Sequence, residues 1–214
     1  MNIALILAGG TGTRMGKVKQ FLPLGKKDVI MYSVDSFCKH SEIDEVYIVL
    51  NNLTYYIKSN AKIKGIIQGG ATRQESSFIG ISEIIKTHNE DDIILIHDAA
   101  RPFITEKIIT DSIKAVKQYG ACATAIQSTD TVFACKDDCV ESVLNRENIY
   151  LAQTPQGFYL GDIYKAHLNN TMQATDDVSL YLSLGKKVKL IEGDTKNFKL
   201  TTMDDYKIAK SLLE

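Results

Sequence analysis

Short apolar runs that alternate with longer amphipathic segments are the feature that most limits how this chain can fold. The runs are rich in β-branched residues, and most are flanked by stretches with helical spacing. This alternation favours an α/β fold with a mostly parallel sheet. The predicted strands are Ile3–Leu7, Val46–Leu50, Ile66–Gln68, Ile93–His97, Ala123–Gln127 and Val188–Ile191.

The predicted helices each have one apolar and one polar side. The clearest follows Thr105, a residue type that caps helix N-termini, and stops at Gly120, a residue type that ends helices. The other predicted helices are Val29–Lys39, Gln74–Lys86, Asp162–Asn169, Asp177–Leu184 and Asp204–Leu213.

One segment departs from the alternation of strands and helices. Two runs with strand character, Thr131–Cys135 and Val140–Leu144, are joined at Lys136-Asp137-Asp138, which predicts a β-hairpin. The hairpin forms an arm at about residues 128–150 that stands apart from the sheet. Its alternating Val and Phe side chains need to be covered by another surface.

The composition is that of one globular domain. Hydrophobic residues make up 44% and charged residues 24%, and 214 residues can bury a large core without disulfides or metal. We find no repeat or linker, so residues 1–214 are predicted to form a single domain. The 25 basic and 26 acidic residues give a net charge of −1, so we expect no nucleic-acid partner.

The sequence also predicts a cytoplasmic location without membrane contact. No window approaches the roughly 18 apolar residues of a membrane span, and no basic leader precedes the first apolar run. The scattered cysteines, Cys38, Cys122, Cys135 and Cys139, give only a weak zinc signal. We expect reduced thiols packed in the interior.

A glycine-rich segment, Leu7-Ala8-Gly9-Gly10-Thr11-Gly12-Thr13-Arg14-Met15-Gly16, follows the first predicted strand. Its small residues let backbone N–H groups converge on an anion. The dinucleotide fingerprint would need a glycine at Met15, and the phosphate loop of ATPases would need Ser or Thr at Val18. Arg14, Lys17 and Lys19 instead place cations where a triphosphate would lie.

Five ordered blocks resemble the cytidylyltransferases that act on 2-C-methyl-D-erythritol 4-phosphate and on ribitol 5-phosphate. The resemblance covers essentially the whole chain. It implies a Rossmann-like nucleotidyltransferase sheet with helices on both faces and a protruding β-hairpin dimerisation arm. The blocks are the glycine-rich segment continued by Lys19–Leu24, then Gly69–Ser76, His97–Phe103, Ala152–Phe158 and Phe198–Thr202.

The same resemblance implies roles for individual residues. CTP would be held by Leu7, Ala8, Gly9, Gly10, Thr11, Gly12, Gly70, Arg73 and Ser76. The two cations at the transition state would be Arg14 and Lys19, and the substrate phosphate would be positioned by Arg146 and Lys199. The polyol phosphate pocket would be completed by Ala99, Arg101, Thr131 and Thr154. The arm would carry Thr131 and Arg146 into a partner subunit, making a homodimer.

Two positions depart from the family pattern. The chain between Met15 and Lys19 is shorter than in relatives, so Lys17 competes for the role of catalytic lysine. We favour Lys19, because Gln-Phe-Leu-Pro follows it. Ala71 stands where relatives often have an acidic residue, which puts a side-chain contact there in doubt.

The charges of the reactants predict the mechanism. Both CTP and a phosphate monoester are anions, and the attacking oxygen already lacks its proton, so no protein base or nucleophile is needed. Arg14, Lys19 and Mg²⁺ would stabilise an in-line attack on the α-phosphorus. Asp98, at a predicted strand end, would bind Mg²⁺ directly or through water, or else cap the turn before Pro102. His97 is interpreted as a residue that orients its loop.

Three other functions compete with the methylerythritol phosphate reaction. A ribitol 5-phosphate cytidylyltransferase is the nearest, because the segment Leu7–Arg14 resembles that enzyme at least as well. Ala100, Gly157 and Thr175-Asp176-Asp177 favour the methylerythritol enzyme. A nucleotide-binding regulator without turnover is a different class, and a hydride-transfer enzyme is disfavoured by the missing dinucleotide fingerprint.

Overall fold

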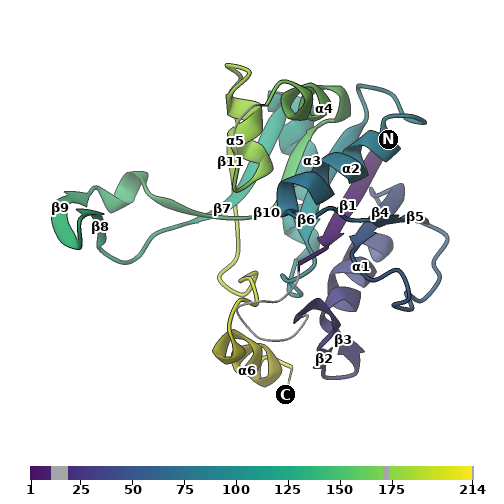
Figure 1. The fold of residues 1–214 in the computed structure, drawn as a ribbon, viewed down its shortest axis with the longest axis horizontal. Helices are drawn as coiled ribbons and strands as arrows, with labels where there is room; N and C mark the ends of the chain where they lie inside the picture. The colour runs from purple at the N-terminus through teal and green to yellow at the C-terminus, as the bar shows by residue number, and fades with distance from the viewer. Residues whose placement is uncertain (11–18, 171–173, 214) are drawn as a thin grey trace.

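The computed structural model describes residues 1–10, 19–170 and 174–213, and within them a seven-stranded sheet has helices on both faces (Figure 1). The strand order is β11-β7-β10-β6-β1-β4-β5, and only β10 runs antiparallel to its neighbours. The mostly parallel α/β fold is therefore confirmed. The strands are β1 (Asn2–Ala8), β4 (Glu45–Leu50), β5 (Ile63–Gln68), β6 (Ile93–Asp98), β7 (Ala121–Gln127), β10 (Tyr150–Tyr159) and β11 (Lys189–Glu192).

The six predicted strands of this sheet are all present, but β10 was not predicted as a strand. Its residues from Gln153 to Phe158 are buried, so they show no alternation of apolar and polar side chains. It also contains Pro155, which breaks most strands. The strand tolerates this proline because its register with β7 shifts between Ala152 and Gln156.

All six predicted helices are confirmed within a few residues. In α3, the Thr105 side chain accepts a hydrogen bond from Ile108 N–H, and Gly120 ends the helix with a φ of 86°. Both end signals therefore act as the sequence predicts. The helices are α1 (Val29–Lys39), α2 (Arg73–Ile84), α3 (Glu106–Tyr119), α4 (Leu160–Leu168), α5 (Asp177–Leu182) and α6 (Met203–Ser211).

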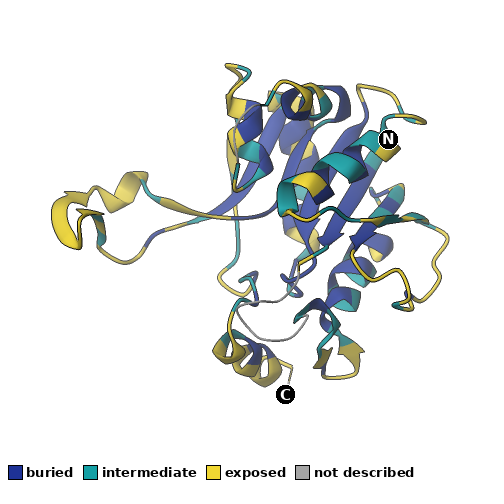
Figure 2. Ribbon diagram, viewed as in Figure 1, coloured by how far each residue is buried: buried dark blue, intermediate teal, exposed yellow. Residues whose placement is uncertain are grey.

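The hairpin arm is also confirmed, as β8 (Val132–Lys136) paired with β9 (Cys139–Leu144). Asp137 and Asp138 both have positive φ angles, 48° and 61°, which suits a tight two-residue hairpin turn. The arm extends away from the body and is mostly exposed (Figures 1 and 2). The expectation that all four cysteines are interior is wrong for Cys135 and Cys139, because the arm adds nothing to the core.

Four short elements complete the described part of the chain. The two-residue strands β2 (Pro23–Leu24) and β3 (Lys27–Asp28) form a small ribbon before α1. The 3-10 helices are η2 (Lys19–Phe21) and η3 (Arg146–Asn148). Among the described residues, no helix combines the length and apolar content that a membrane crossing requires.

The two larger clusters of the core lie one on each face of the sheet, whose strands are mostly buried (Figure 2), and a smaller cluster packs around Leu24, Leu200 and Tyr206. Residues Ile3, Leu5 and Leu7 of β1 face the layer that contains α2, α4 and α5. Ala4 and Ile6 face the layer that contains α1 and α3. Because β1 is buried on both faces, it reads as a continuous apolar run, which is typical of parallel sheets.

This topology decides where a ligand can bind. Strands β1, β4, β5 and β6 are mutually parallel, so their carboxyl ends meet at one edge of the sheet. Open α/β sheets bind ligands in the crevice outside this edge. The glycine-rich segment follows β1, the Gly69-Gly70 pair follows β5, and Asp98 ends β6.

Gly157 in β10 tests how tightly α3 packs on the sheet. A Cβ atom at Gly157 would lie 2.7 Å from Val116 Cγ2 and 2.9 Å from both Cys122 Sγ and Leu95 Cδ2. All three side chains are fully buried. We expect Gly157→Ala to lower the free energy of unfolding by about 1–3 kcal/mol in urea titrations. A Cβ atom at Gly10 would have no atom within 4 Å, so Gly10→Ala should leave the free energy of unfolding nearly unchanged. Equal stability of G157A and wild type would contradict the close packing of α3 on the sheet.

Candidate active site

The loops after β1, β4 and β5 approach one another so closely that a side chain at Gly69 would clash and one at Gly9 would have little room. Asn51, just after β4, donates a hydrogen bond from its side chain to the carbonyl of Gly9. A Cβ atom at Gly69 would lie 2.5 Å from Asn51 Oδ1, and one at Gly9 would lie 3.0 Å from Ser76 Oγ. The glycines therefore let backbone, rather than side chains, line this edge.

Gln20 forms hydrogen bonds to the described part of the glycine-rich segment. This buried side chain donates from Nε2 to the carbonyls of Ala8 (2.6 Å) and Gly10 (2.8 Å). Gln20 belongs to η2, which begins at Lys19. Leu7 and Ala8 are buried in β1, and Gly10 is exposed.

Several predicted residues of this segment cannot be placed. Thr11, Gly12 and Arg14, together with the alternative lysine Lys17, lie outside the described residues. Lys19 is described, and its positive charge is one of the smaller contributions to the lowered pKa of Asp205. Burial alone would raise that pKa, and backbone hydrogen bonds from Thr202 and Thr201 lower it.

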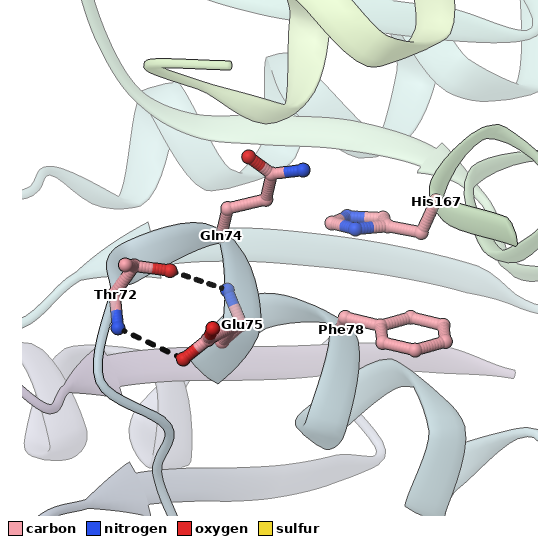
Figure 3. A pocket seen from close by; sticks show the side chains of 5 residues that line it. All are labelled: Thr72, Gln74, Glu75, Phe78 and His167. Carbon is pink, nitrogen blue, oxygen red and sulfur yellow. Dashed lines mark hydrogen bonds between the residues drawn. The ribbon is translucent and has the colours of Figure 1, made fainter. Parts of the chain in front are cut away.

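The start of α2 is closed by a capping box. The Thr72 side chain accepts from Glu75 N–H, and the Glu75 carboxylate accepts from Thr72 N–H (Figure 3). The same carboxylate accepts from Ala71 N–H at 2.7 Å, and Ser76 Oγ accepts from Gly70 N–H at 3.2 Å. At Ala71, where relatives often have an acidic residue, the backbone N–H therefore already donates a hydrogen bond to Glu75.

Asp98 lies between two cations at the end of β6. Its Oδ1 accepts from Arg73 Nε at 3.0 Å, and its Oδ2 accepts from Lys199 Nζ at 2.6 Å. Burial alone would raise the pKa of Asp98, but Arg73 and Lys199 hold it well below its usual range. The carboxylate is ionised at neutral pH, and the three predicted residues Arg73, Asp98 and Lys199 are brought together.

Arg73 also contacts a second buried carboxylate. Its NH1 group donates to Asp177 Oδ2 at 2.8 Å, while Asp177 Oδ1 accepts from Ser77 Oγ at 2.6 Å and from His167 Nε2 at 3.0 Å. Burial opposes ionisation of Asp177, yet Arg73 and these hydrogen bonds lower its pKa to about 2. For Arg73, burial would lower the pKa, and the two carboxylates raise it instead.

Asp177, Ser77 and His167 were not among the predicted site residues. In the sequence, Asp177 was the start of a predicted helix and part of the Thr175-Asp176-Asp177 segment, and neither observation gave it a role in the site. The contact with Arg73 joins residues 104 positions apart, so no local pattern reports it. The acidic pair Asp176-Asp177 at a helix start was the one signal that could have drawn attention to it.

Arg101 is buried, and its guanidinium binds backbone carbonyls. NH1 donates to Asn197 O at 2.8 Å, and NH2 donates to Ala152 O at 3.1 Å. Burial lowers the pKa of Arg101. The side chain thus joins β10 to the segment that carries Lys199. The neighbouring Ala99 is fully buried.

Thr154 links β10 to the end of β6. His97 Nε2 faces the carbonyl of Arg101 at 3.2 Å, and because a carbonyl only accepts, Nε2 carries the proton. Nδ1 is then an acceptor for the Thr154 hydroxyl at 3.0 Å, and the same hydroxyl accepts from Asp98 N–H at 3.1 Å. Burial lowers the pKa of His97 to about 4, so it is neutral at neutral pH. These contacts fit the interpretation of His97 as a residue that orients its loop.

Two predicted site residues belong to the arm rather than to the ion network around Asp98. Thr131 and Arg146 are exposed on the arm, which extends away from the body (Figure 1). Arg146 NH1 donates to the carbonyl of Thr129 at 3.2 Å.

The described residues contain no cluster of three or more His, Cys, Asp or Glu side chains that could hold a metal by themselves. Asp98 is the carboxylate at the end of β6, on the ligand-binding edge. Mg²⁺ in nucleotide sites is commonly bound by one or two carboxylates together with substrate phosphates. One carboxylate beside a triphosphate would fit this donor set.

Comparisons with known proteins agree in one family. The family model described as "IspD: 2-C-methyl-D-erythritol 4-phosphate cytidylyltransferase" matches residues 2–214. A 2-C-methyl-D-erythritol 4-phosphate cytidylyltransferase from Clostridium acetobutylicum is 38% identical, covering 100% of this chain and 98% of that protein. A ribitol-5-phosphate cytidylyltransferase from Vibrio parahaemolyticus is 37% identical, covering 100% and 96%.

Solved structures extend the similarity to the fold. A crystal structure of 4-diphosphocytidyl-2C-methyl-D-erythritol synthase has a TM-score of 0.86 and 28% identity, covering 100% of this chain and 98% of that one. The 2-C-methyl-D-erythritol 4-phosphate cytidylyltransferase from Thermus thermophilus has a TM-score of 0.81 and 28% identity, covering 99% and 98%.

The lowered pKa of Asp177 predicts how stability depends on pH. The carboxylate stabilises the folded state fully above its unfolded pKa of about 4, and this contribution is lost as pH falls toward about 2. Asp177→Asn should therefore lower the free energy of unfolding by about 2–3 kcal/mol at pH 7. The difference from wild type should shrink as pH falls from 5 toward 2 in urea titrations.

A matched control is Asp204→Asn, because Asp204 is an exposed partner of Lys207. Exposed pairs contribute about 0–1 kcal/mol, so this variant should stay close to wild type. A deficit in D177N that is the same at every pH would show that the charge of Asp177 is not what stabilises the fold.

Proposed function

Because the chain belongs to the 2-C-methyl-D-erythritol 4-phosphate cytidylyltransferase family, we propose that it transfers CMP from CTP to 2-C-methyl-D-erythritol 4-phosphate and releases pyrophosphate. The observation that carries the proposal is the placement of Arg73, Asp98 and Lys199 in one ion network at the carboxyl edge. The glycine-lined loops lie at the same edge. Cations beside such loops suit two phosphate-bearing substrates.

Repulsion between the two substrates is the main obstacle to this reaction. CTP is an anion, and a phosphate monoester is nearly doubly charged at neutral pH because its second pKa is about 6. Two unit charges about 4 Å apart interact by about 4 kcal/mol at an effective dielectric constant of about 20. Several cations held in fixed positions are therefore needed to bring the substrates together.

In the proposed step, a phosphate oxygen of the polyol phosphate attacks the α-phosphorus of CTP in line with the leaving pyrophosphate. A new P–O bond forms to CMP as the bond to pyrophosphate breaks. The attacking oxygen is already deprotonated, so no side chain has to remove a proton. Arg14 and Lys19 would stabilise the charge on the triphosphate, while Lys199 and a partner's copy of Arg146 would hold the attacking phosphate.

The remaining predicted residues would bind and shape the pocket. CTP would lie over the glycine-rich segment, the Gly70 loop and Ser76, with Arg73 beside it. Ala99, Arg101 and Thr154 would form the buried wall of the polyol phosphate pocket, and the arm would add Thr131. Bound Mg²⁺, held by Asp98 directly or through water and by the nucleotide phosphates, would neutralise phosphate charge.

The arm supports a homodimer as the active unit. Phe133 and Val143 pair across its two strands and are 53% and 63% exposed. Apolar side chains this exposed on a protruding hairpin suit burial against another chain. A second copy would cover them and receive Arg146 at its own site.

The four free cysteines support the expected reducing, cytoplasmic environment.

Ribitol 5-phosphate is the alternative substrate, supported by the relatives with that activity. Pyrophosphate release with CTP, Mg²⁺ and each polyol phosphate in turn distinguishes the candidates. We expect turnover with 2-C-methyl-D-erythritol 4-phosphate to exceed turnover with ribitol 5-phosphate. The reverse order would reassign the substrate. If neither polyol phosphate leads to pyrophosphate release although CTP binds tightly, the result would favour a regulator that binds nucleotide without turnover.

Arg14 and Lys19 should matter for turnover more than for folding. Arg14→Ala or Lys19→Ala should lower kcat by about 100-fold, as expected for loss of one electrostatic stabiliser of the transition state. Lys207→Ala is the control, because Lys207 is exposed on α6 and pairs with Asp204 of the same helix. Near-normal kcat in a folded Arg14 or Lys19 variant would refute that residue's role.

Mixing two inactive variants tests whether Arg146 acts across a dimer. Arg146→Ala and Lys199→Met should each be nearly inactive alone. In a mixed dimer one site has both an intact Lys199 and an intact Arg146 from the other chain, so re-equilibrated equal mixtures should recover roughly a quarter of wild-type activity. No recovery, with mixed dimers shown to form, would mean that both residues act within one chain.

A further inference from the structure

His167 is a buried histidine of α4 to which the proposed reaction assigns no role. Its Nε2 donates to Asp177 Oδ1 at 3.0 Å, and both side chains are only 1% exposed. An ionised carboxylate has no proton to donate and can only accept, so Nε2 must carry the proton in this contact. The hydrogen bond therefore lies between a ring on α4 and the first residue of α5.

Asp177 passes this contact on to Arg73. The two carboxylate oxygens of Asp177 have separate partners: Oδ1 accepts from His167 and Ser77, and Oδ2 accepts from Arg73 NH1. The two donors on Oδ1 fix the plane of the carboxylate, and this plane sets where Oδ2 points. His167 thus helps to define the orientation of the Arg73 guanidinium through Asp177.

The ring of His167 is itself fixed against α2. It stacks on Phe78 with 5.6 Å between ring centroids and an interplanar angle of 14° (Figure 3). Arg73, Ser77 and Phe78 all belong to α2. His167 therefore contacts α2 in two ways, through the ring of Phe78 and through the carboxylate that binds Arg73 and Ser77.

Arg73 carries this orientation to the ligand-binding edge. Its Nε donates to Asp98 Oδ1, and Asp98 Oδ2 binds Lys199. The guanidinium is planar, so fixing NH1 on Asp177 and Nε on Asp98 leaves it a single orientation. At 24% exposure the side chain of Arg73 is still accessible from the solvent edge.

We propose that His167 is a positioning residue that orients Arg73 for CTP through Asp177. The inference rests on the proposed function, because it assumes that Arg73 contacts CTP. A purely structural histidine would support folding but leave the affinity for CTP unchanged. A positioning histidine affects KM for CTP, and a substitution that keeps its hydrogen bond should preserve that KM.

Two substitutions separate these roles. His167→Phe keeps a flat ring against Phe78 and removes the donor, whereas His167→Gln places an amide N–H donor at a similar reach. We expect H167F to raise KM for CTP by about tenfold, with a smaller change in kcat, because a hydrogen bond to a charged group is lost. H167Q should stay within about threefold of wild type, since its donor still reaches Asp177. Thermal melts accompany both assays.

A matched control uses His88, which donates to Glu45 Oε2 at 3.0 Å, the same distance as the His167 contact. Glu45 opens β4 at the amino edge of the sheet, opposite the candidate site. His88→Phe should change stability without changing KM for CTP. If H167F is not recovered folded, His167→Asn, whose shorter amide falls short of Asp177, replaces it with the same expectation.

The inference is overturned if the wild type is active and folded H167F has the same KM for CTP as the wild type. Equal losses in H167F and H167Q would overturn it as well, because the donor would then not matter. Failure of the proposed function is a different result: wild type would release no pyrophosphate with either polyol phosphate. Calorimetric titration with CTP would then still measure whether H167F binds the nucleotide more weakly than H167Q.

Discussion

The guanidinium of Arg73 bridges two buried carboxylates, Asp98 at the end of β6 and Asp177 at the start of α5. Two buried negative charges at the same edge would each be costly without this shared cation. The bridge therefore fixes the relative positions of β6, α2 and α5. It also leaves Asp98 free to hold Lys199 through its other oxygen. Of the cations proposed to meet the two substrates, Arg73 and Lys199 are placed by this single arrangement.

Buried hydrogen bonds around this network hold its residues in place. Thr154 and His97 hold the backbone of Asp98, and Arg101 ties β10 to the segment before Lys199. These groups would affect activity by holding Asp98 and Lys199 in position, even without contacting a substrate. A catalytic strategy that depends on fixed charge, rather than on a base or a nucleophile, requires this kind of support. The described residues at this edge come from the ends of β1, β4, β5 and β6 and from the starts of α2 and α5.

Much of the fold could be predicted because its signals are local. Periodicity located the helices and six strands, and the Thr105 and Gly120 signals marked both ends of α3. The strand β10 was missed because its buried polar residues and Pro155 hide the usual alternation. Resemblance named Arg73 and Lys199, and the end of a predicted strand indicated Asp98, but their shared network joins residues up to 101 positions apart. Asp177 and His167 were missed for the same reason, since their roles exist only in the folded chain.

The most direct test of this account is the affinity of CTP for Arg73→Lys. Lysine keeps the positive charge but cannot contact both carboxylates with the planar geometry of arginine. Calorimetric titration with CTP and Mg²⁺ should give a Kd about tenfold weaker than wild type, while the protein stays folded. An R73K variant that binds CTP as tightly as wild type would contradict the claim that this bridge organises the nucleotide site.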